Sequence, residues 1–286
     1  MQLDFKAWAT RIAAVTALLP AFALPCLAAG IETAWVEGSK FKTRLIAGSA
    51  ARSSEQPRTF AAVEMRMEQG WKTYWRMPGD AGGMPPRFDW SGSVNLASAT
   101  VSYPAPQRMA DAIGDSLGYK GVAIFPVDIR AEDPSKPVEL KATLEFGVCR
   151  EICIPADATL SLIIPPGTTP AAAEIAAALA AVPRDAGARR PDDPQLKSVE
   201  AHLQGDKPKL IVEALYPADA NSADLFVEGP QDIYLPVPVK VGESNGVARF
   251  EVDLSQNTEA PPLLGKTLTV TMTSKAGASE ANWVVK

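Results

Sequence analysis

Two cysteines, Cys149 and Cys153, are the residues of this sequence whose type and spacing favour chemistry. They lie in the segment LEFGVCREICIPADATLSL, residues 144–162, in which strand-like residues stand on both sides of the pair. The pattern predicts a strand that ends at Cys149, a short connection, and a second strand that follows Cys153. Cysteines at the mouth of such a hairpin can come within the Cα separation that a disulfide needs. The sequence therefore predicts a thiol–disulfide site.

A redox role and a purely structural role are both open for this pair. The loop that a Cys149–Cys153 bridge would close is so short that loop entropy contributes only about 2 kcal/mol, near the low end for disulfides. A stabilising bridge would gain more by joining distant strands, so the spacing favours a dithiol that opens and recloses. The positive charge of Arg150 would favour a thiolate next to it, whereas Glu151 would oppose one.

Copper binding is a third interpretation of the pair. Met65, Met67, Met77 and Met84 lie close together in the sequence, and methionine and cysteine sulfurs are the soft ligands that Cu(I) prefers. Methionines at this spacing in strands are more often core residues. Nothing in the sequence places them near Cys149, so we assign no metal site.

Several other chemistries lack the residues that they need. His202 is the only histidine of the chain, and no Gly-x-Ser-x-Gly motif accompanies it, so a serine–histidine–acid triad is not expected. The sequence contains no P-loop and no Gly-x-Gly-x-x-Gly motif, which argues against nucleotide chemistry. The formal net charge of −5 disfavours nucleic acid as a partner.

Residues 1–28 are typical of a signal peptide. A positively charged start precedes a short apolar run at residues 12–24, and small residues suit cleavage after Ala28. The run is too short to span a bilayer comfortably. Cleavage would remove Cys26 and leave an even number of cysteines. We therefore expect export to the periplasm, an oxidising compartment in which paired cysteines are normally disulfides.

The expected fold is all-β, with two immunoglobulin-like β-sandwich domains joined by a linker with a short helix. In residues 29–165, short runs rich in β-branched and aromatic residues alternate with Gly-, Pro-, Asp- and Ser-rich turns, which is typical of a sandwich. These runs are residues 59–67, 94–103, 122–129, 138–146 and 159–164.

Residues 166–195 differ in kind from the stretches on either side. The alanine-rich run at residues 171–182 predicts a helix, either within a linker or packed on the edge of a domain. From residue 196 to residue 286 the alternation of apolar and polar residues returns, and we expect a second β-sandwich there. Its expected strands are residues 209–216, 224–228, 247–254 and 267–274.

The cysteine hairpin and two further stretches resemble the N-terminal periplasmic domain of the transmembrane disulfide reductase DsbD, especially in its ScsB-type versions. The hairpin stretch is FGVCREICIPADATLSL. The stretch EQGWKTYWRMPGDAGGMPPRFDWSGS, residues 68–93, is similar to the family's Gly-Trp-x-x-Tyr-Trp strand and Pro-rich turn. The stretch at residues 103–127 is similar to its cap-loop region. The resemblance covers about residues 33–165, and no motif extends it to the second β region.

The resemblance implies a thiol–disulfide oxidoreductase module. Electrons would come from a membrane-embedded disulfide reductase of the DsbD, CcdA or ScsB type and pass to periplasmic thioredoxin-fold proteins. Cys153 matches the family cysteine that forms mixed disulfides with partners, and Cys149 would resolve them. No metal, organic cofactor, nucleotide or nucleic acid is expected in this exchange.

The resemblance also implies which residues surround the pair. Residues 114–121, GDSLGYKG, match the cap that shields the disulfide until a partner docks. Ordinary packing is the alternative role for the apolar and aromatic residues of this set, and a turn role is the alternative for Asp115. The candidate residues are Asp115, Leu117 and Tyr119 in the cap, and Trp71 and Tyr74 beside the pair.

Three features depart from the family pattern. The spacer between the cysteines is shorter than in the best-known members, and Leu117-Gly118-Tyr119 stands where those members have an aromatic pair. The sequence contains no transmembrane block and no thioredoxin-like domain, so we expect a separate membrane protein as the electron donor. The alternative function is a non-enzymatic two-sandwich binding or assembly module with a structural disulfide, in copper handling or cytochrome maturation.

Overall fold

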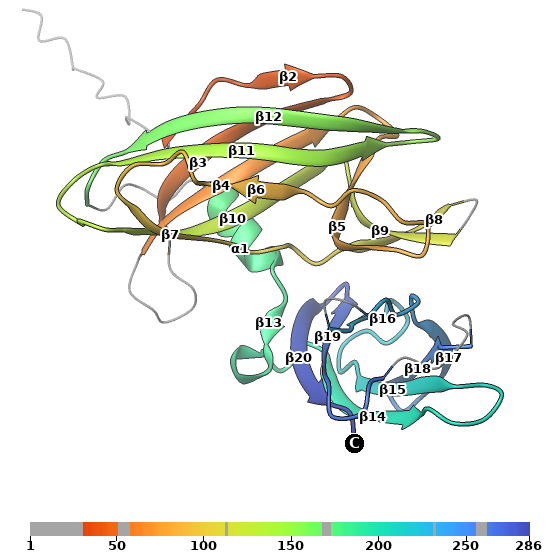
Figure 1. Cartoon of the computed structure of the whole chain (residues 1–286). Coiled ribbons are helices and arrows are strands. Elements are labelled where there is room, and N and C mark those ends of the chain that lie inside the picture. Colours follow the sequence, from red (N-terminus) through yellow and green to blue (C-terminus); the bar gives the residue numbers. More distant parts are fainter. Residues whose placement is uncertain (1–30, 51–57, 112–113, 168–172, 231–232, 256–261) are drawn as a thin grey trace, which may run out of the picture.

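The computed structural model describes residues 31–50, 58–111, 114–167, 173–230, 233–255 and 262–286. The signal peptide predicted at residues 1–28 lies outside them. Apart from one α-helix and one short 3₁₀ turn, the regular elements of the described chain are strands, and these form four sheets stacked as two sandwiches (Figure 1). The all-β fold class expected from the sequence is confirmed. None of the described helices is long and apolar enough to cross a membrane.

The first sandwich consists of two six-stranded antiparallel sheets. One sheet has the order β1-β3-β4-β10-β7, with β2 paired to β3; the other has the order β12-β11-β5-β9-β8, with β6 paired to β11. The strands of the first sheet are β1 Ile31–Glu32, β2 Val36–Gly38, β3 Phe41–Ala50, β4 Arg58–Met67, β7 Leu96–Val101 and β10 Val122–Ala131. Those of the second are β5 Lys72–Gly79, β6 Arg87–Asp89, β8 Gln107–Asp111, β9 Gly114–Lys120, β11 Val138–Cys149 and β12 Cys153–Ile164.

Alternating burial along β11 shows how the sequence builds the core of this sandwich. From Val138 to Phe146, every second residue is buried between the sheets, as the two-residue period of a strand requires. The alternation stops at the end of the strand, where the last four residues are all buried. This end carries Cys149, so this cysteine lies where β11 is covered on both faces.

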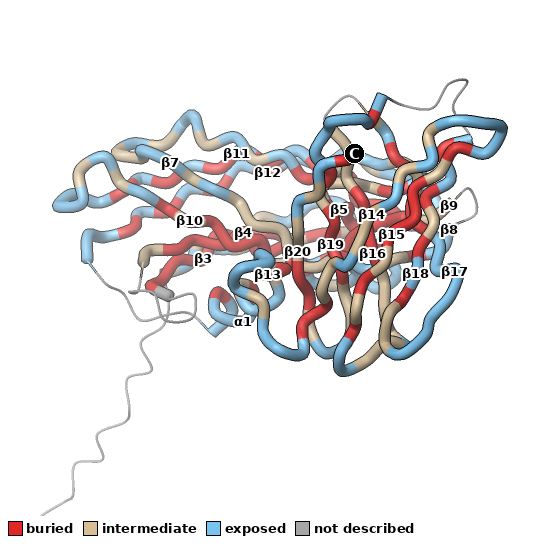
Figure 2. Tube along the Cα trace, turned by 90° about the horizontal axis from the view of Figure 1, so that it is seen from below, coloured by how far each residue is buried: buried red, intermediate tan, exposed pale blue. Residues whose placement is uncertain are grey.

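The second sandwich consists of two four-stranded sheets, of which β13 Arg184–Asp185 pairs in parallel with its neighbour β20 and all other strands pair antiparallel. Its core is apolar, with Val212, Phe250 and Val270 fully buried or nearly so, and Figure 2 shows buried positions running along its strands. The remaining strands are β14 Gln195–His202, β15 Lys209–Leu215, β16 Asp224–Glu228, β17 Val239–Ser244, β18 Val247–Asp253, β19 Thr267–Ser274 and β20 Gly277–Val284; a 3₁₀ turn covers Ala186–Ala188.

The helix between the sandwiches, α1 at Ala173–Ala181, packs against the first sandwich. Its Ile175 is completely buried in a small apolar cluster with Ile46, Phe60 and Ala62 on the outer face of β3 and β4. Burial of one apolar helix face against a sheet explains why this short, alanine-rich segment is helical. Of the two arrangements considered for the helix, the structure shows the one packed on a domain.

The two sandwiches share a packed interface. Phe226 of β16 and Val237 belong to the same buried cluster as the core of the first sandwich, and the rings of Trp75 and Phe226 lie 5.7 Å apart. Around this apolar contact, Arg76 of β5 binds Glu228 and Glu280 of the second sandwich. The second sandwich therefore lies against β5, the strand that also borders the cysteine hairpin (Figure 1).

Candidate redox site

The β11–β12 hairpin positions the cysteines by strand register. Its antiparallel ladder is unbroken from the Val138–Ile164 pair to the Cys149–Cys153 pair, which closes it. Residues 150–152 make the connection, with the amide of Arg150 donating to the carbonyl of Ile152 at 3.0 Å. Because the two cysteines face each other across the strands, their Cα atoms are 4.1 Å apart and the sulfurs form a disulfide.

The two sulfur-bearing residues differ in exposure. Cys149 is 1% exposed, whereas Cys153 is exposed, as is Ile152 before it. An attacking thiolate must reach a disulfide sulfur in line, so access decides which sulfur is attacked. The geometry therefore presents Cys153 to an incoming partner and keeps Cys149 behind it.

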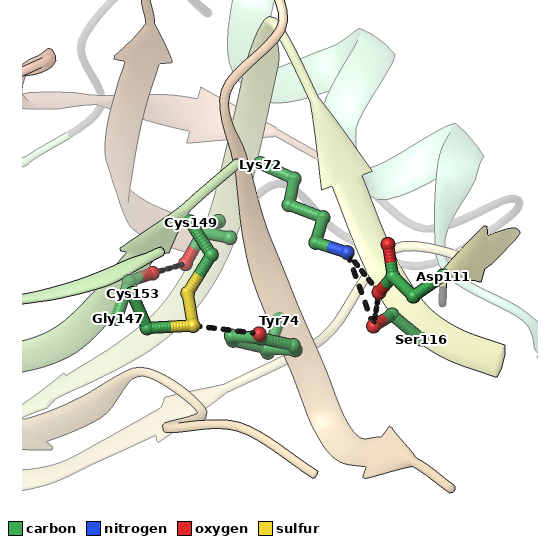
Figure 3. The surroundings of a disulfide bond; sticks show 8 residues. Lys72, Tyr74, Asp111, Ser116, Gly147, Cys149 and Cys153 are labelled. Atoms are coloured by element: carbon green, nitrogen blue, oxygen red, sulfur yellow. Dashed lines mark hydrogen bonds and ion pairs between the residues drawn. A yellow bond between two sulfur atoms is a disulfide. The ribbon is translucent and has the colours of Figure 1, made fainter. Parts of the chain in front are cut away.

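Tyr74 lies directly against the exposed cysteine. Its hydroxyl is 3.2 Å from Sγ of Cys153 (Figure 3), and its ring is buried. Gly83 packs so closely on this ring that a Cβ on residue 83 would lie 2.4 Å from ring carbons, and a Cβ on Gly147 would lie 3.3 Å from Cβ of Met84. The segment Gly79–Met84 thus forms a wall, which we call the strap, that holds Tyr74 at the disulfide.

Hydrogen bonds tie this wall and β5 to the cysteine hairpin. The amide of Gly147 donates to the carbonyl of Met84 at 2.9 Å, and the buried hydroxyl of Thr73 donates to the carbonyl of Gly147 at 2.9 Å. Gly147 is two residues before Cys149, so these bonds fix the strand end that carries the buried sulfur.

A buried polar cluster lies behind Tyr74. The ammonium of Lys72 donates to the carboxylate of Asp111 and, at 3.1 Å, to Ser116, and Ser116 donates to the same carboxylate (Figure 3). Burial raises the pKa of Asp111, but hydrogen bonds from Lys72 and Ser116 and the Lys72 charge outweigh this and lower it below its ordinary value. The carboxylate is therefore ionised at neutral pH.

The same cluster affects the Tyr74 phenol. Burial and the negative charge of Asp111 raise the pKa of Tyr74, and the neighbouring Ser116 hydroxyl opposes them only in part. The phenol consequently stays protonated across the physiological range, which leaves its hydroxyl able to donate a hydrogen bond to sulfur.

Trp71 occupies a different place from Tyr74. Its ring is buried, and the guanidinium of Arg150 lies 5.6 Å from the ring centroid, a cation–π distance. Arg150 connects the two cysteine strands, so this contact anchors the tip of the hairpin to β5. Trp71 thus lies beside the connection between the cysteines, whereas Tyr74 lies beside the sulfur.

The predicted cap is not a loop. Residues 114–120 form strand β9, paired with β5 on one side and β8 on the other. Leu117 is fully buried in the core, and Tyr119 packs edge-on against Phe125 at 5.4 Å and donates its hydroxyl to the carbonyl of Pro104. Asp115 accepts from Arg108 at 2.8 Å, toward the second sandwich. Leu117 and Tyr119 therefore pack in the first sandwich, while Asp115 lies in a strand, where it pairs with Arg108. A shielding role for these residues stays a prediction.

Sequence reasoning missed Lys72, Asp111, Ser116 and the strap. One signal was present: Lys72 is a charged residue inside the aromatic strand GWKTYW, and a buried lysine requires a partner. Two of the methionines considered as copper ligands, Met65 and Met67, belong to the core of the first sandwich. The core-filling interpretation therefore holds for these two.

Comparison with known proteins supports the resemblance seen in the sequence. Residues 42–165 match the family model described as thiol:disulfide interchange protein DsbD, N-terminal. The resemblance to the DsbD N-terminal domain is confirmed. Residues 181–286 match a second family model, described as a domain of unknown function (DUF8393). Among curated proteins, no sequence matches this chain significantly.

Solved structures extend the comparison to both sandwiches. The N-terminal periplasmic domain of ScsB from Proteus mirabilis is 20% identical, with a TM-score of 0.69 over 90% of this chain and 99% of that chain. At this identity the likeness shows a shared fold, and its coverage extends that fold beyond the DsbD-like region. The reduced DsbD N-terminal domain of Neisseria meningitidis is 18% identical over 44% of this chain and 90% of its own, with a TM-score of 0.25.

Proposed function

We propose that this protein is a periplasmic thiol–disulfide exchange protein that passes electrons through the Cys149–Cys153 pair. A membrane-embedded disulfide reductase of the DsbD, CcdA or ScsB type would reduce the pair, and periplasmic thioredoxin-fold proteins would accept the electrons. The observation that carries the proposal is the disulfide at the open end of a DsbD-like hairpin, with one sulfur-bearing residue exposed and the other buried.

The exchange proceeds in two balanced halves. A donor thiolate attacks Sγ of Cys153, the Cys149–Cys153 bond breaks, and Cys149 leaves as a thiolate; the second donor thiol then releases the donor as a disulfide, leaving both cysteines reduced. In the second half, the Cys153 thiolate attacks the acceptor disulfide. Cys149 then attacks Cys153 in the mixed disulfide, which restores the Cys149–Cys153 bond and frees the acceptor as a dithiol.

Tyr74 serves both halves of this exchange. Whenever Cys153 carries negative charge, the protonated hydroxyl at 3.2 Å donates a hydrogen bond to the sulfur, which favours the thiolate. Cys149, buried in the hairpin, is withheld from partners but lies next to Cys153, the position that a resolving thiol needs.

The experiment that tests the proposal compares single-cysteine variants of the mature protein with oxidised glutathione as the probe. Cys149→Ser should accumulate a stable mixed disulfide with glutathione, because Cys153 is exposed and no resolving thiol remains. Cys153→Ser should form the adduct at least tenfold more slowly, because Cys149 is buried. Mass spectrometry reads both. Equal rates in the two variants would contradict the assigned roles.

The reduction potential of the wild-type pair is the companion measurement. We expect a value well above about −300 mV, the range of labile and exchanging disulfides. Thiol trapping and mass spectrometry across a glutathione buffer series give this value. A potential below that limit would mark the bridge as structural and reject the exchange function.

A further inference from the structure

Lys72 is a buried cation at a place where core packing alone would favour an apolar residue. The residue is 5% exposed and lies on β5, where its register partners are Cys149 on one side and Lys120 on the other. Replacing a buried ion pair by apolar residues is often neutral or stabilising. Only the cation of the Lys72–Asp111 pair is buried, since the side chain of Asp111 is 28% exposed, and such a pair is weak evidence for a stabilising role. Its position beside the disulfide directs attention to the redox step.

The pair lies next to the group that contacts sulfur. Lys72 and Tyr74 are two residues apart on one strand and so project from the same face, and Nζ of Lys72 lies 6.0 Å from the centroid of the Tyr74 ring. Figure 3 shows Tyr74 between Cys153 and the polar cluster of Lys72, Asp111 and Ser116. Ser116 and Lys72 are buried, whereas the side chain of Asp111 is partly exposed.

We propose that Lys72 and Asp111 are positioning residues that set the stability of the Cys153 thiolate through Tyr74. The proposal rests on the exchange function proposed above and adds groups that never touch the partner. The ammonium favours negative charge on Cys153, the carboxylate disfavours it, and Ser116 joins the two so that both stay beside Tyr74. The buried ammonium of Lys72 is screened little by water, whereas the partly exposed carboxylate of Asp111 is screened more.

Other charged groups near the pair are exposed to solvent. Lys120 lies on β9 and contributes to the low pKa of Asp111, while Arg150 and Glu151 belong to the hairpin connection. All three are exposed, so water and salt screen their effect on the sulfur. Lys72, 6.0 Å from the Tyr74 ring, and Asp111, whose charge raises the pKa of Tyr74, are thus the charged groups that act on this ring most directly.

The test compares the Cys153 thiolate fraction after removal of the positive charge with the fraction after removal of the negative charge. In the full-length mature protein with Cys149→Ser, the only thiol is Cys153. Its rate of alkylation by iodoacetamide at pH 7, divided by the plateau rate at high pH, gives the thiolate fraction independently of access. We expect Lys72→Met to lower this fraction about threefold or more and Asp111→Asn to raise it by a similar factor, as an interior charge several ångströms away would do. Lys72→Arg should restore most of it.

Matched controls separate electrostatics from disturbed folding. Lys209 and Glu251 form an ion pair on the second sandwich, so Lys209→Met and Glu251→Gln should leave the thiolate fraction unchanged. Tyr74→Phe should lower the fraction, whereas Tyr119→Phe should not, because the Tyr119 hydroxyl is bonded to Pro104. The two second-sandwich variants thus match Lys72→Met and Asp111→Asn in the charge that they remove, and Tyr119→Phe matches Tyr74→Phe in the hydroxyl that it removes.

Opposite shifts from Lys72→Met and Asp111→Asn support the proposal, because general disruption would move both variants the same way. A fraction that is unchanged or lowered in Asp111→Asn overturns it, even if Lys72→Met does not fold, since this replacement keeps the shape of the side chain. The outcome is independent of partner exchange. The glutathione-adduct rates and the reduction potential can contradict the exchange function. The thiolate fraction can contradict the role of Lys72 and Asp111.

Discussion

The two sandwiches bury charge in different places. In the second, the carboxylate of Asp193 is 1% exposed and pairs with Arg184 of the edge strand β13, while pairs such as Lys209–Glu251 lie partly in solvent. In the first, the ammonium of Lys72 is buried on β5, where its register partner is Cys149. Both sandwiches therefore bury charge, and the first differs because one of its buried charges lies beside the disulfide.

The interface between the sandwiches combines apolar packing with ion pairs. Trp75 is fully buried and packs on Phe226, which supplies apolar area. Arg76 and Arg108 reach from the first sandwich to carboxylates of the second, and both guanidinium groups also lie over aromatic rings. The second sandwich is therefore joined to the sheet that carries the cysteine pair by packing at the centre and by charge around it, the arrangement typical of a stable interface.

The largest expected effect comes from removing the centre of this interface. Trp75→Ala deletes a completely buried ring, and the lost packing and the cavity should cost about 3–5 kcal/mol in the free energy of unfolding. Urea denaturation measures it. The matched variant is Trp90→Ala, because Trp90 is only partly buried and stacks on Phe88, and its cost should be less than half as large. Equal costs would mean that the sandwiches are not coupled through Trp75.

A smaller effect should follow from removing the charge at the interface. Arg76→Met leaves the partly buried carboxylates of Glu228 and Glu280 without their cation, which should cost about 2 kcal/mol. The control is Arg249→Met, whose pair with Glu213 is more exposed and whose loss should stay within about 0.5 kcal/mol. Thermal unfolding at low and high salt compares them. A cost for Arg76→Met no larger than that of the control would show that the charged rim contributes specificity and not stability.

The hairpin and the fold class could be predicted because their signals are local. Residues 138–164 alternate along two strands whose pairing follows from a single short connection, and the alanine-rich helix follows from propensity. No long-range information was required for either. The disulfide belongs to this local part, because its two cysteines are strand neighbours.

The polar cluster and the position of the cap could not be predicted because they depend on pairing between distant segments. Residues 114–120 carry two glycines and two charged residues, which favour a loop, yet they form β9 because β5 pairs with them. Lys72 meets Asp111 and Ser116 only through that pairing. The contact between Trp75 and Phe226 joins residues on different sandwiches, and no pattern within either domain contains it.

A further contact between the sandwiches involves the strap that packs on Tyr74. Asp80 in the strap accepts hydrogen bonds from the hydroxyl of Tyr234 and, at 2.8 Å, from the amide of Val237. Three residues further on, Gly83 packs on the Tyr74 ring. The second sandwich thus holds one end of the strap, which keeps Tyr74 against Cys153.

Asp80→Ala should therefore have a small effect on stability, about 1 kcal/mol, and a local effect on the strap. The amides of Ala81 and Gly82 donate to the carbonyls of Asp115 and Gly79, and their hydrogen exchange should become faster when the anchor is lost. Asp133→Ala, which removes a comparable acceptor for Ser135 in a turn of the first sandwich, should leave these amides unchanged. If Asp80→Ala also leaves the exchange of these amides unchanged, the first sandwich alone holds the strap. The second sandwich would then stabilise the first only through the Trp75–Phe226 contact and the ion pairs around it.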